Sequence, residues 1–161
     1  MTTFPEKAHR NKYCVTHTSG VTSKILVPVD GSENSRRAFD KALSLAKDSG
    51  ATLTAIHVIE NPPTVYVESQ KLLDNLLANY RKESSKVLDQ FEEIAEKQGI
   101  KIQAFIMEGD PASNIINYAK NEGFDMIVIG SRGLGKIKEM MLGSTSRKVI
   151  HYAHCPVLVV K

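Results

Sequence analysis

The sequence predicts an α/β protein, with a single doubly wound domain built on a five-stranded parallel sheet. Runs rich in Val, Ile and Leu alternate with amphipathic helical patterns from Ser23 to the end of the chain. Strands of that composition, separated by helices, are typical of parallel sheets that are covered on both faces. A chain of 161 residues is long enough for one domain with a sizeable core.

The alternation defines five strands and four helices, without an internal repeat or a low-complexity segment. The predicted strands cover residues 24–30, 52–59, 101–108, 124–129 and 156–160. The predicted helices cover about 33–48, 67–98, 111–122 and 143–153.

Turn and capping residues set the boundaries of the first two strand–helix pairs. Pro28 lies near the end of the first strand, where its missing N–H does least harm. Ser32 is predicted to cap the first helix, which Gly50 ends. The second strand stops before Asn61-Pro62-Pro63. The apolar side of the long helix that follows comprises Leu73, Leu77, Tyr80, Val87, Phe91 and Ile94.

The same kinds of signal bound the second half of the chain. Gly99 ends the long helix. Asp110 and Pro111 supply a capping side chain and a proline at the first helical position, and Gly123 stops that helix. The fourth strand then leads into a glycine-rich loop, a short helix and a last apolar strand.

Connectivity predicts where a ligand would lie. Right-handed crossovers determine how each helix lies on the sheet. Strands one to three are expected to step outward one way and strands four and five to lie on the other side, in the order 3-2-1-4-5. The ends of strands one and four then meet at the reversal, where such sheets hold ligands. Asp30 and Gly130 are therefore expected to face each other across one crevice.

The glycine-rich loop has the pattern of an anion site. Gly130-Ser131-Arg132-Gly133 is followed, nine residues later, by Gly143-Ser144-Thr145-Ser146. Glycines let the backbone approach a ligand, and a helix start offers unpaired N–H groups and the positive end of a dipole, so phosphate is the expected ligand. The three hydroxyls are expected to cap the helix whether or not a ligand is present. An ordinary strand–loop–helix connection is the alternative.

The residues around this loop admit two interpretations each. Asp30 either accepts hydrogen bonds from the vicinal hydroxyls of a ribose, which the predicted reversal favours, or caps the turn into the first helix. Arg132 either reaches a phosphate or is solvent-exposed. Val58, with Pro28 and Val29, either forms an apolar slot for a purine or, as buried strands usually do, packs in the core.

Other chemistries fit the sequence poorly. A P-loop would need Ser or Thr at Ile137, and a dinucleotide fingerprint would need glycine at Lys138. His151, His154 and Cys155 lack the spacing and the fourth ligand of a zinc site. No nucleophile elbow or acid–base pair is evident, and His57 is interpreted as a half-buried histidine, so no catalytic residue and no metal-binding side chain is assigned.

Composition excludes several function classes. The net charge is +3, of which the first 22 residues carry +2, and no basic stripe with interleaved aromatics suggests nucleic acid. No apolar run is long enough to span a membrane, and the polar start of the chain is not a secretory signal, so a cytoplasmic protein is expected. Cys14 and Cys155 are expected to be free thiols. Residues 1–22 are interpreted as a flexible arm, a cloning remnant or an added edge element, and 23–161 as the domain.

These motifs together resemble the universal stress protein family. The resemblance is carried by Ile25-Leu26-Val27-Pro28-Val29-Asp30-Gly31-Ser32, by His57-Val58-Ile59, by the G-x2-G-x9-G-S spacing from Gly130 to Ser144, and by Cys155-Pro156-Val157-Leu158-Val159-Val160. It covers about Ser23 to Lys161. It implies an adenine nucleotide alpha hydrolase-like fold of five parallel strands, an ATP site of the subgroup that keeps the glycine spacing, and a homodimer paired through the last strands.

The resemblance also assigns roles by position. It implies that Asp30 contacts the ribose and that Pro28, Val29 and Val58 surround the adenine. The phosphate-binding set that it implies comprises Gly130, Gly133, Gly143, Ser144 and Thr145, with Arg132 and Ser146 beside them.

Three functions follow as hypotheses. The leading one is a nucleotide-dependent regulatory module in stress response, in which ATP, or AMP or ADP, stabilises a conformation or dimer that protein partners recognise. The second is a slow ATPase that uses Mg²⁺ held with the phosphates. The third is an adaptor that needs no nucleotide. The last strand, apolar on both faces, is itself a candidate edge for pairing in a dimer.

Overall fold

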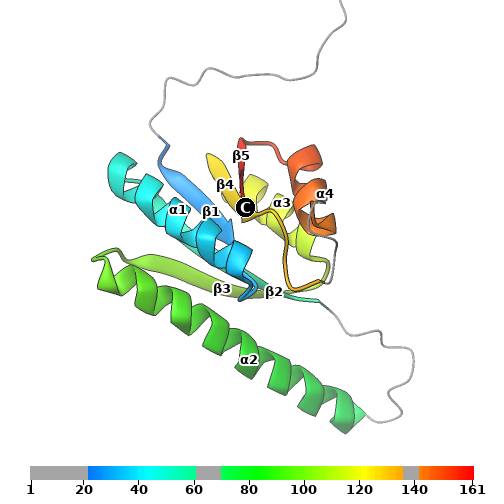
Figure 1. The fold of residues 1–161 in the computed structure, drawn as a ribbon. Helices are drawn as coiled ribbons and strands as arrows, with labels where there is room; N and C mark the ends of the chain where they lie inside the picture. Colours follow the sequence, from blue (N-terminus) through cyan, green and yellow to red (C-terminus); the bar gives the residue numbers. More distant parts are fainter. Residues whose placement is uncertain (1–21, 61–69, 136–141) are drawn as a thin grey trace, which may run out of the picture.

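A computed structural model of the chain describes residues 22–60, 70–135 and 142–161. Its five parallel strands form one sheet in the order β3-β2-β1-β4-β5 (Figure 1), so the predicted architecture and order are confirmed. The strands are β1 (Lys24–Pro28), β2 (Thr52–Ile59), β3 (Ile102–Glu108), β4 (Met126–Gly130) and β5 (Val157–Val160). The described helices are α1 (Glu33–Ser49), α2 (Gln70–Lys97), α3 (Pro111–Asn121) and α4 (Ser144–Tyr152).

Two helical layers cover the sheet. Helices α1 and α2 pack on one face and α3 and α4 on the other (Figure 1). Alternate residues of β1 divide between the two cores: Ile25 and Val27 face α1 and α2, and Leu26 faces α3 and α4. All three are completely buried, as a central strand between two layers requires.

The predicted caps are confirmed at α1 and α3. Ser32 Oγ accepts the Ser35 N–H at 3.2 Å, and Gly50 adopts a left-handed φ of 71° after the last turn of α1. At α3, the Asp110 carboxylate accepts the N–H and the hydroxyl of Ser113, at 2.8 and 2.7 Å. These hydrogen bonds stabilise the ionised carboxylate and hold the pKa of Asp110 below its usual value.

Strand β1 ends two residues earlier than predicted, and β4 begins two residues later and ends one residue later than predicted. The Val29 N–H still bonds to the Ile56 carbonyl at 2.8 Å, but β1 ends at Pro28. Strand β4 begins at Met126, two residues later than predicted, because the Phe124 N–H closes the last turn of α3 on the Ala119 carbonyl at 2.9 Å.

Several predictions fall on residues that the structure does not describe. They concern the arm over 1–21 with Cys14, the turn at Asn61-Pro62-Pro63, residues 67–69 of the long helix, and Ile137 and Lys138 in the glycine-rich loop.

An aromatic pair joins the two helices of one layer. The rings of Phe39 in α1 and Phe91 in α2 meet edge to face, with centroids 4.8 Å apart. Both side chains are 0–1% exposed. This pair holds the C-terminal half of α2 against α1, over β1 and β2.

We expect Phe91→Ala to lower the free energy of unfolding by about 3–5 kcal/mol, because it removes a ring from a closed core. Phe105→Ala is the matched control, since Phe105 on β3 is 42% exposed, and it should cost much less. Urea denaturation of both variants measures the difference. Equal losses would show that the Phe39–Phe91 contact is not a principal part of the core.

Candidate functional site

The carboxyl ends of β1 and β4 meet at the reversal of the sheet. Asp30 Oδ2 accepts the backbone N–H of Leu134, in the glycine-rich loop, at 3.1 Å. Its Oδ1 accepts the Ser32 N–H at 2.9 Å. The expected juxtaposition of Asp30 with this loop is therefore confirmed, and Asp30 also makes the turn-capping contact that was its alternative interpretation.

Two glycines of the loop have no room for a side chain. A Cβ on Gly133 would overlap Asp30 Oδ2, and a Cβ on Gly130 would lie 2.8 Å from the Asn34 backbone carbon. Neither glycine has a positive φ, so close approach and not backbone conformation requires them. Together they bring the loop backbone against the end of β1 and the start of α1.

The start of α4 differs from the capping prediction. Gly143 occupies the N-cap, and no side chain accepts a hydrogen bond from the first turn. The buried hydroxyl of Ser146 turns back instead and donates to the Gly130 carbonyl at 2.9 Å. The prediction that the three hydroxyls cap this helix is wrong, because a glycine holds the cap position and Ser146 serves to tie α4 to β4.

The loop and α4 are further joined through the backbone of Ser131. Its carbonyl accepts the Gly143 N–H at 2.8 Å, and its own N–H donates to the Val160 carbonyl of β5 at 2.6 Å. The two ends of the glycine motif are thus held side by side although nine residues separate Gly133 from Gly143. The N-terminal amides of α4 are fixed next to the loop and are left without a side-chain cap.

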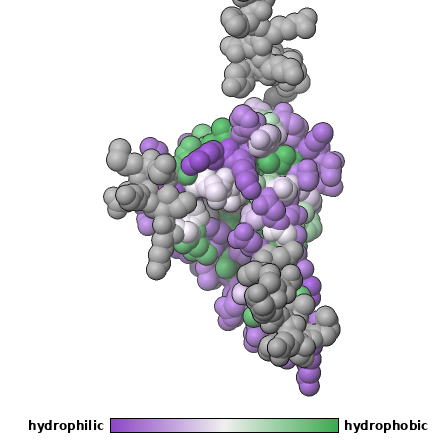
Figure 2. Space-filling model, turned by 90° about the vertical axis from the view of Figure 1, so that its right-hand side faces the viewer, coloured by the Kyte–Doolittle hydropathy of each residue, from purple (hydrophilic) through white to green (hydrophobic). Residues whose placement is uncertain are grey.

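A cavity of about 640 Å³ lies at this carboxyl edge. Figure 2 views the molecule from this side, where near-neutral residues, drawn almost white, lie among hydrophilic ones. The structure brings all the residues predicted for the site to this one cavity. They are Pro28, Val29, Asp30, Val58, Gly130, Arg132, Gly133, Gly143, Ser144, Thr145 and Ser146.

The charges around the cavity are unevenly distributed. Arg132, which is partly buried, and the N-terminus of α4 lie at the β4 end. Glu60, which follows β2, and Glu83 of α2 lie at the other end. The ion pair between Glu83 and Lys86, with oxygen and nitrogen 2.8 Å apart, holds the pKa of Glu83 below its usual value, so this carboxylate stays charged.

Part of the cavity wall is formed by residues that the sequence does not predict for the site. Besides the predicted residues, the cavity is lined by His57 of β2, by one side of α2, and by Pro111 and Ile115 of α3. The α2 residues concerned are Tyr80, Glu83, Ser84 and Val87. The sequence places Tyr80 and Val87 on the apolar side of the long helix, but nothing in it shows that α2 reaches past the end of β2.

His57 holds the end of β1. Its Nδ1 lies 2.8 Å from the Val29 carbonyl oxygen. Because a carbonyl only accepts, Nδ1 carries the proton, and a neutral ring then keeps Nε2 as an acceptor. The imidazole is half-buried, as predicted, and fixes the backbone that leads into Asp30.

The two remaining sequence interpretations concern cysteine and zinc. Cys155 is a free thiol, as predicted, and burial raises its pKa to about 11. In the described parts of the chain no group of three or more His, Cys, Asp or Glu is arranged to hold a metal ion. Nor is any helix there both long and apolar enough to cross a membrane.

A doubly wound sheet with a glycine-rich loop at the point where its strand order reverses is typical of the class of α/β folds that bind nucleotides there. Within it, the chain belongs to the universal stress protein family, whose model matches residues 22–161. The universal stress protein YxiE of Bacillus subtilis is 39% identical over 147 residues, which span 86% of this chain and 99% of that protein.

Solved structures share the fold. The universal stress protein UspA from Lactobacillus plantarum superposes with a TM-score of 0.81 at 28% identity, over 88% of this chain and 99% of its own. Three more distant structures, at 22–24% identity and TM-scores of 0.64–0.68, align with 86–88% of this chain and 91–100% of theirs. They are a complex with cAMP, an Archaeoglobus fulgidus protein with dAMP and an Arabidopsis thaliana protein with AMP.

We expect Gly133→Ala to disrupt the contact between Asp30 and the loop, because the added Cβ overlaps the carboxylate. Gly135→Ala is the matched control, since a Cβ there has nothing within 4 Å. Hydrogen exchange at the Leu134 amide should accelerate in the first variant and not in the second. Similar exchange in the two variants would show that the Asp30 contact does not hold the loop.

Proposed function

We propose that this protein binds an adenine nucleotide, with ATP as the first candidate. It would act as a regulatory module in stress response in the cytoplasm. The observation that carries the proposal is the meeting of Asp30 with the glycine-rich loop in one cavity. Relatives with the same fold that are complexes with AMP, dAMP or cAMP support the adenine class.

The ribose would lie on Asp30. A carboxylate accepts hydrogen bonds from two vicinal hydroxyls, and Asp30 is partly exposed at the cavity. Its bond to the Leu134 N–H at 3.1 Å leaves further lone pairs for a ligand. The carboxylate would thus place the sugar between the two charged ends of the cavity.

The phosphates would lie at the β4 end. Gly130, Gly133 and Gly143 supply backbone without side chains, and the uncapped start of α4 supplies amides of Ser144 and Thr145. Arg132 adds a positive charge at the same end. This donor set suits an anion of several oxygens. Any Mg²⁺ would be held by the phosphates, since the described residues offer it no group of three or more His, Cys, Asp or Glu.

The site favours binding over hydrolysis. Around the loop the described lining residues are glycines, hydroxyl residues, Leu134 and Arg132, and the nearest carboxylate, Asp30, is assigned to the ribose. A general base for attacking water is therefore not evident among them. A slow Mg²⁺-dependent ATPase is the second candidate, and single-turnover assays with labelled ATP, comparing the native protein with Gly133→Val, distinguish the two.

Asp30→Ala should weaken AMP and ATP binding by about 10- to 100-fold, because it removes hydrogen bonds to a charged acceptor. Isothermal titration calorimetry gives the affinities, with Asp40→Ala, an exposed carboxylate on α1, as the control. A 2′,3′-dideoxy nucleotide should bind both proteins equally. A loss of the same size for the dideoxy nucleotide would remove the ribose assignment.

We further propose a homodimer paired through β5. This strand is at the edge of the sheet, and Val157–Val160 are all partly exposed. The Pro156 carbonyl accepts the Ile127 N–H of β4, and the Val160 carbonyl accepts the N–H of Ser131, which follows β4. By the alternation of parallel ladders, the N–H groups of Val157 and Val159 therefore face the open edge. An apolar edge strand with free donors favours pairing with a second copy.

Light scattering at micromolar concentration should therefore show a dimer. Val159→Pro should shift it toward monomer, since it removes an outward N–H without removing a bond to β4. Circular dichroism confirms that the variant remains folded. A native protein that is monomeric throughout this range would overturn the pairing.

A further inference from the structure

We propose that α2 forms the base-recognition wall of the site and that Tyr80 stacks on the purine ring. This inference rests on the proposed function, because it requires a nucleotide with its ribose on Asp30. It adds a residue that the motifs do not contain. The wall is the strip of Tyr80, Ser84 and Val87, which lie four and three residues apart on one face of α2.

The order of the strands decides which way the base extends. Asp30 follows β1, which lies between β4 and β2. Phosphates on the β4 side leave the β2 side for the base. The cavity continues in that direction, over His57, Val58 and Ile59, and α2 closes it there.

Charge supports the same orientation. On the β2 side Glu60 carries a carboxylate that repels phosphate, whereas Glu83 there is paired with Lys86. Arg132 and the amides of α4 are on the opposite side. A nucleotide that entered the other way round would place its phosphates near the Glu60 carboxylate and its base against the cationic end.

Two contacts fix the level of Tyr80 along the sheet. The neighbouring Arg81 pairs with Glu108, the last residue of β3, through Nε and Oε1 2.6 Å apart. At the inner end of the strip, Val87 lies beside Gly31, since a Cβ there would be 3.6 Å from its methyl group. The separation of seven residues between Val87 and Tyr80 spans about 10 Å along the helix. Tyr80 therefore lies about as far beyond the ribose position as a base attached to that ribose would extend.

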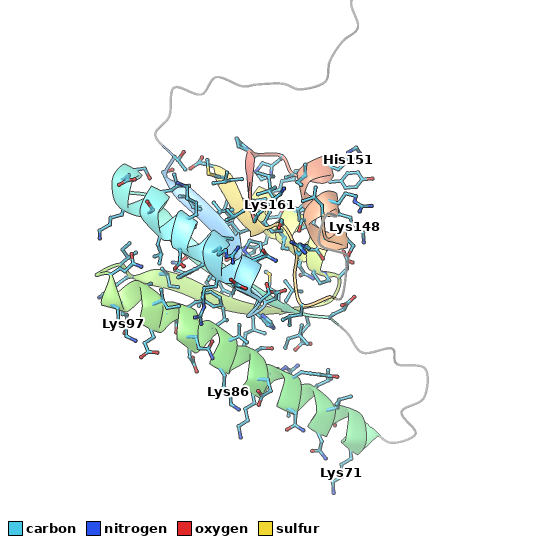
Figure 3. The ribbon with its side chains drawn as sticks, in the orientation of Figure 1. Lys71, Lys86, Lys97, Lys148, His151 and Lys161 are labelled. Carbon is cyan, nitrogen blue, oxygen red and sulfur yellow. The ribbon has the colours of Figure 1, made fainter. Side chains whose placement is uncertain are left out.

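Tyr80 is a partly exposed lining residue of the cavity. It is 41% exposed, and no described side chain makes a ring contact or hydrogen bond with its phenol. The lysines Lys71, Lys86 and Lys97 point away from the sheet on the outer side of α2 (Figure 3), so the strip occupies the inner side. Among the described lining residues Tyr80 is the one Phe, Tyr or Trp, and aromatic rings are the usual stacking partners of bases.

Affinity provides the first test. Tyr80→Ala should weaken AMP binding by about 10-fold, from the loss of stacking, and Tyr80→Phe should leave it within about 2-fold. Tyr152→Ala is the matched control, because Tyr152 is 66% exposed on α4 and does not line the cavity. Circular dichroism and urea denaturation check that each variant is folded.

Fluorescence provides a measurement that would not change if Tyr80 had only a structural role. The chain has no Trp and five Tyr, so its emission comes from tyrosine alone. Saturating AMP should quench part of this emission in the native protein and in Tyr152→Phe. The quenched part should be absent in Tyr80→Phe, even though that variant binds AMP by calorimetry.

The outcomes separate the two proposals. A native protein that binds none of AMP, ADP and ATP by calorimetry would overturn the proposed function and this inference with it. A native protein that binds AMP, with unchanged affinity in Tyr80→Ala or unchanged quenching in Tyr80→Phe, would overturn only the role of Tyr80.

Discussion

The site depends on the approach of the Asp30 carboxylate to the backbone of the glycine-rich loop. A carboxylate can lie this close only where the opposing residue has no side chain, and Gly133 meets that requirement. The resulting hydrogen bond to Leu134 joins the end of β1 to the chain that leaves β4, over 104 residues of sequence. One acidic group and a set of backbone donors thereby share a cavity.

The strand order gives that cavity a direction. Because β1 has β4 on one side and β2 on the other, the groups around Asp30 divide into a donor-rich, cationic side and a carboxylate-bearing side. A nucleotide is itself divided, with charge at one end and an aromatic base at the other. The proposed orientation places the phosphates on the donor-rich side and the base on the carboxylate-bearing side, where α2 lines the cavity.

The start of α4 shows how a local rule is overridden. Ser144, Thr145 and Ser146 are good capping residues by type, yet Gly143 takes the cap and Ser146 turns to the Gly130 carbonyl. The first turn keeps its unpaired amides beside the loop. Leaving these donors without a side-chain partner is unfavourable for an isolated helix and suitable for binding an anion.

The fold, the strand order, the caps at Ser32 and Asp110, and the residues of the glycine motif could all be predicted from the amino-acid sequence. These follow from periodicity, turn chemistry and the handedness of crossovers, which are local or nearly so. Three features are seen only in the folded chain: the hydroxyls after Gly143 do not cap α4, His57 binds the Val29 carbonyl, and α2 lines the cavity with Tyr80. Such contacts depend on how far each helix extends past the sheet and on which distant groups compete for the same donor, and no spacing in the chain encodes either.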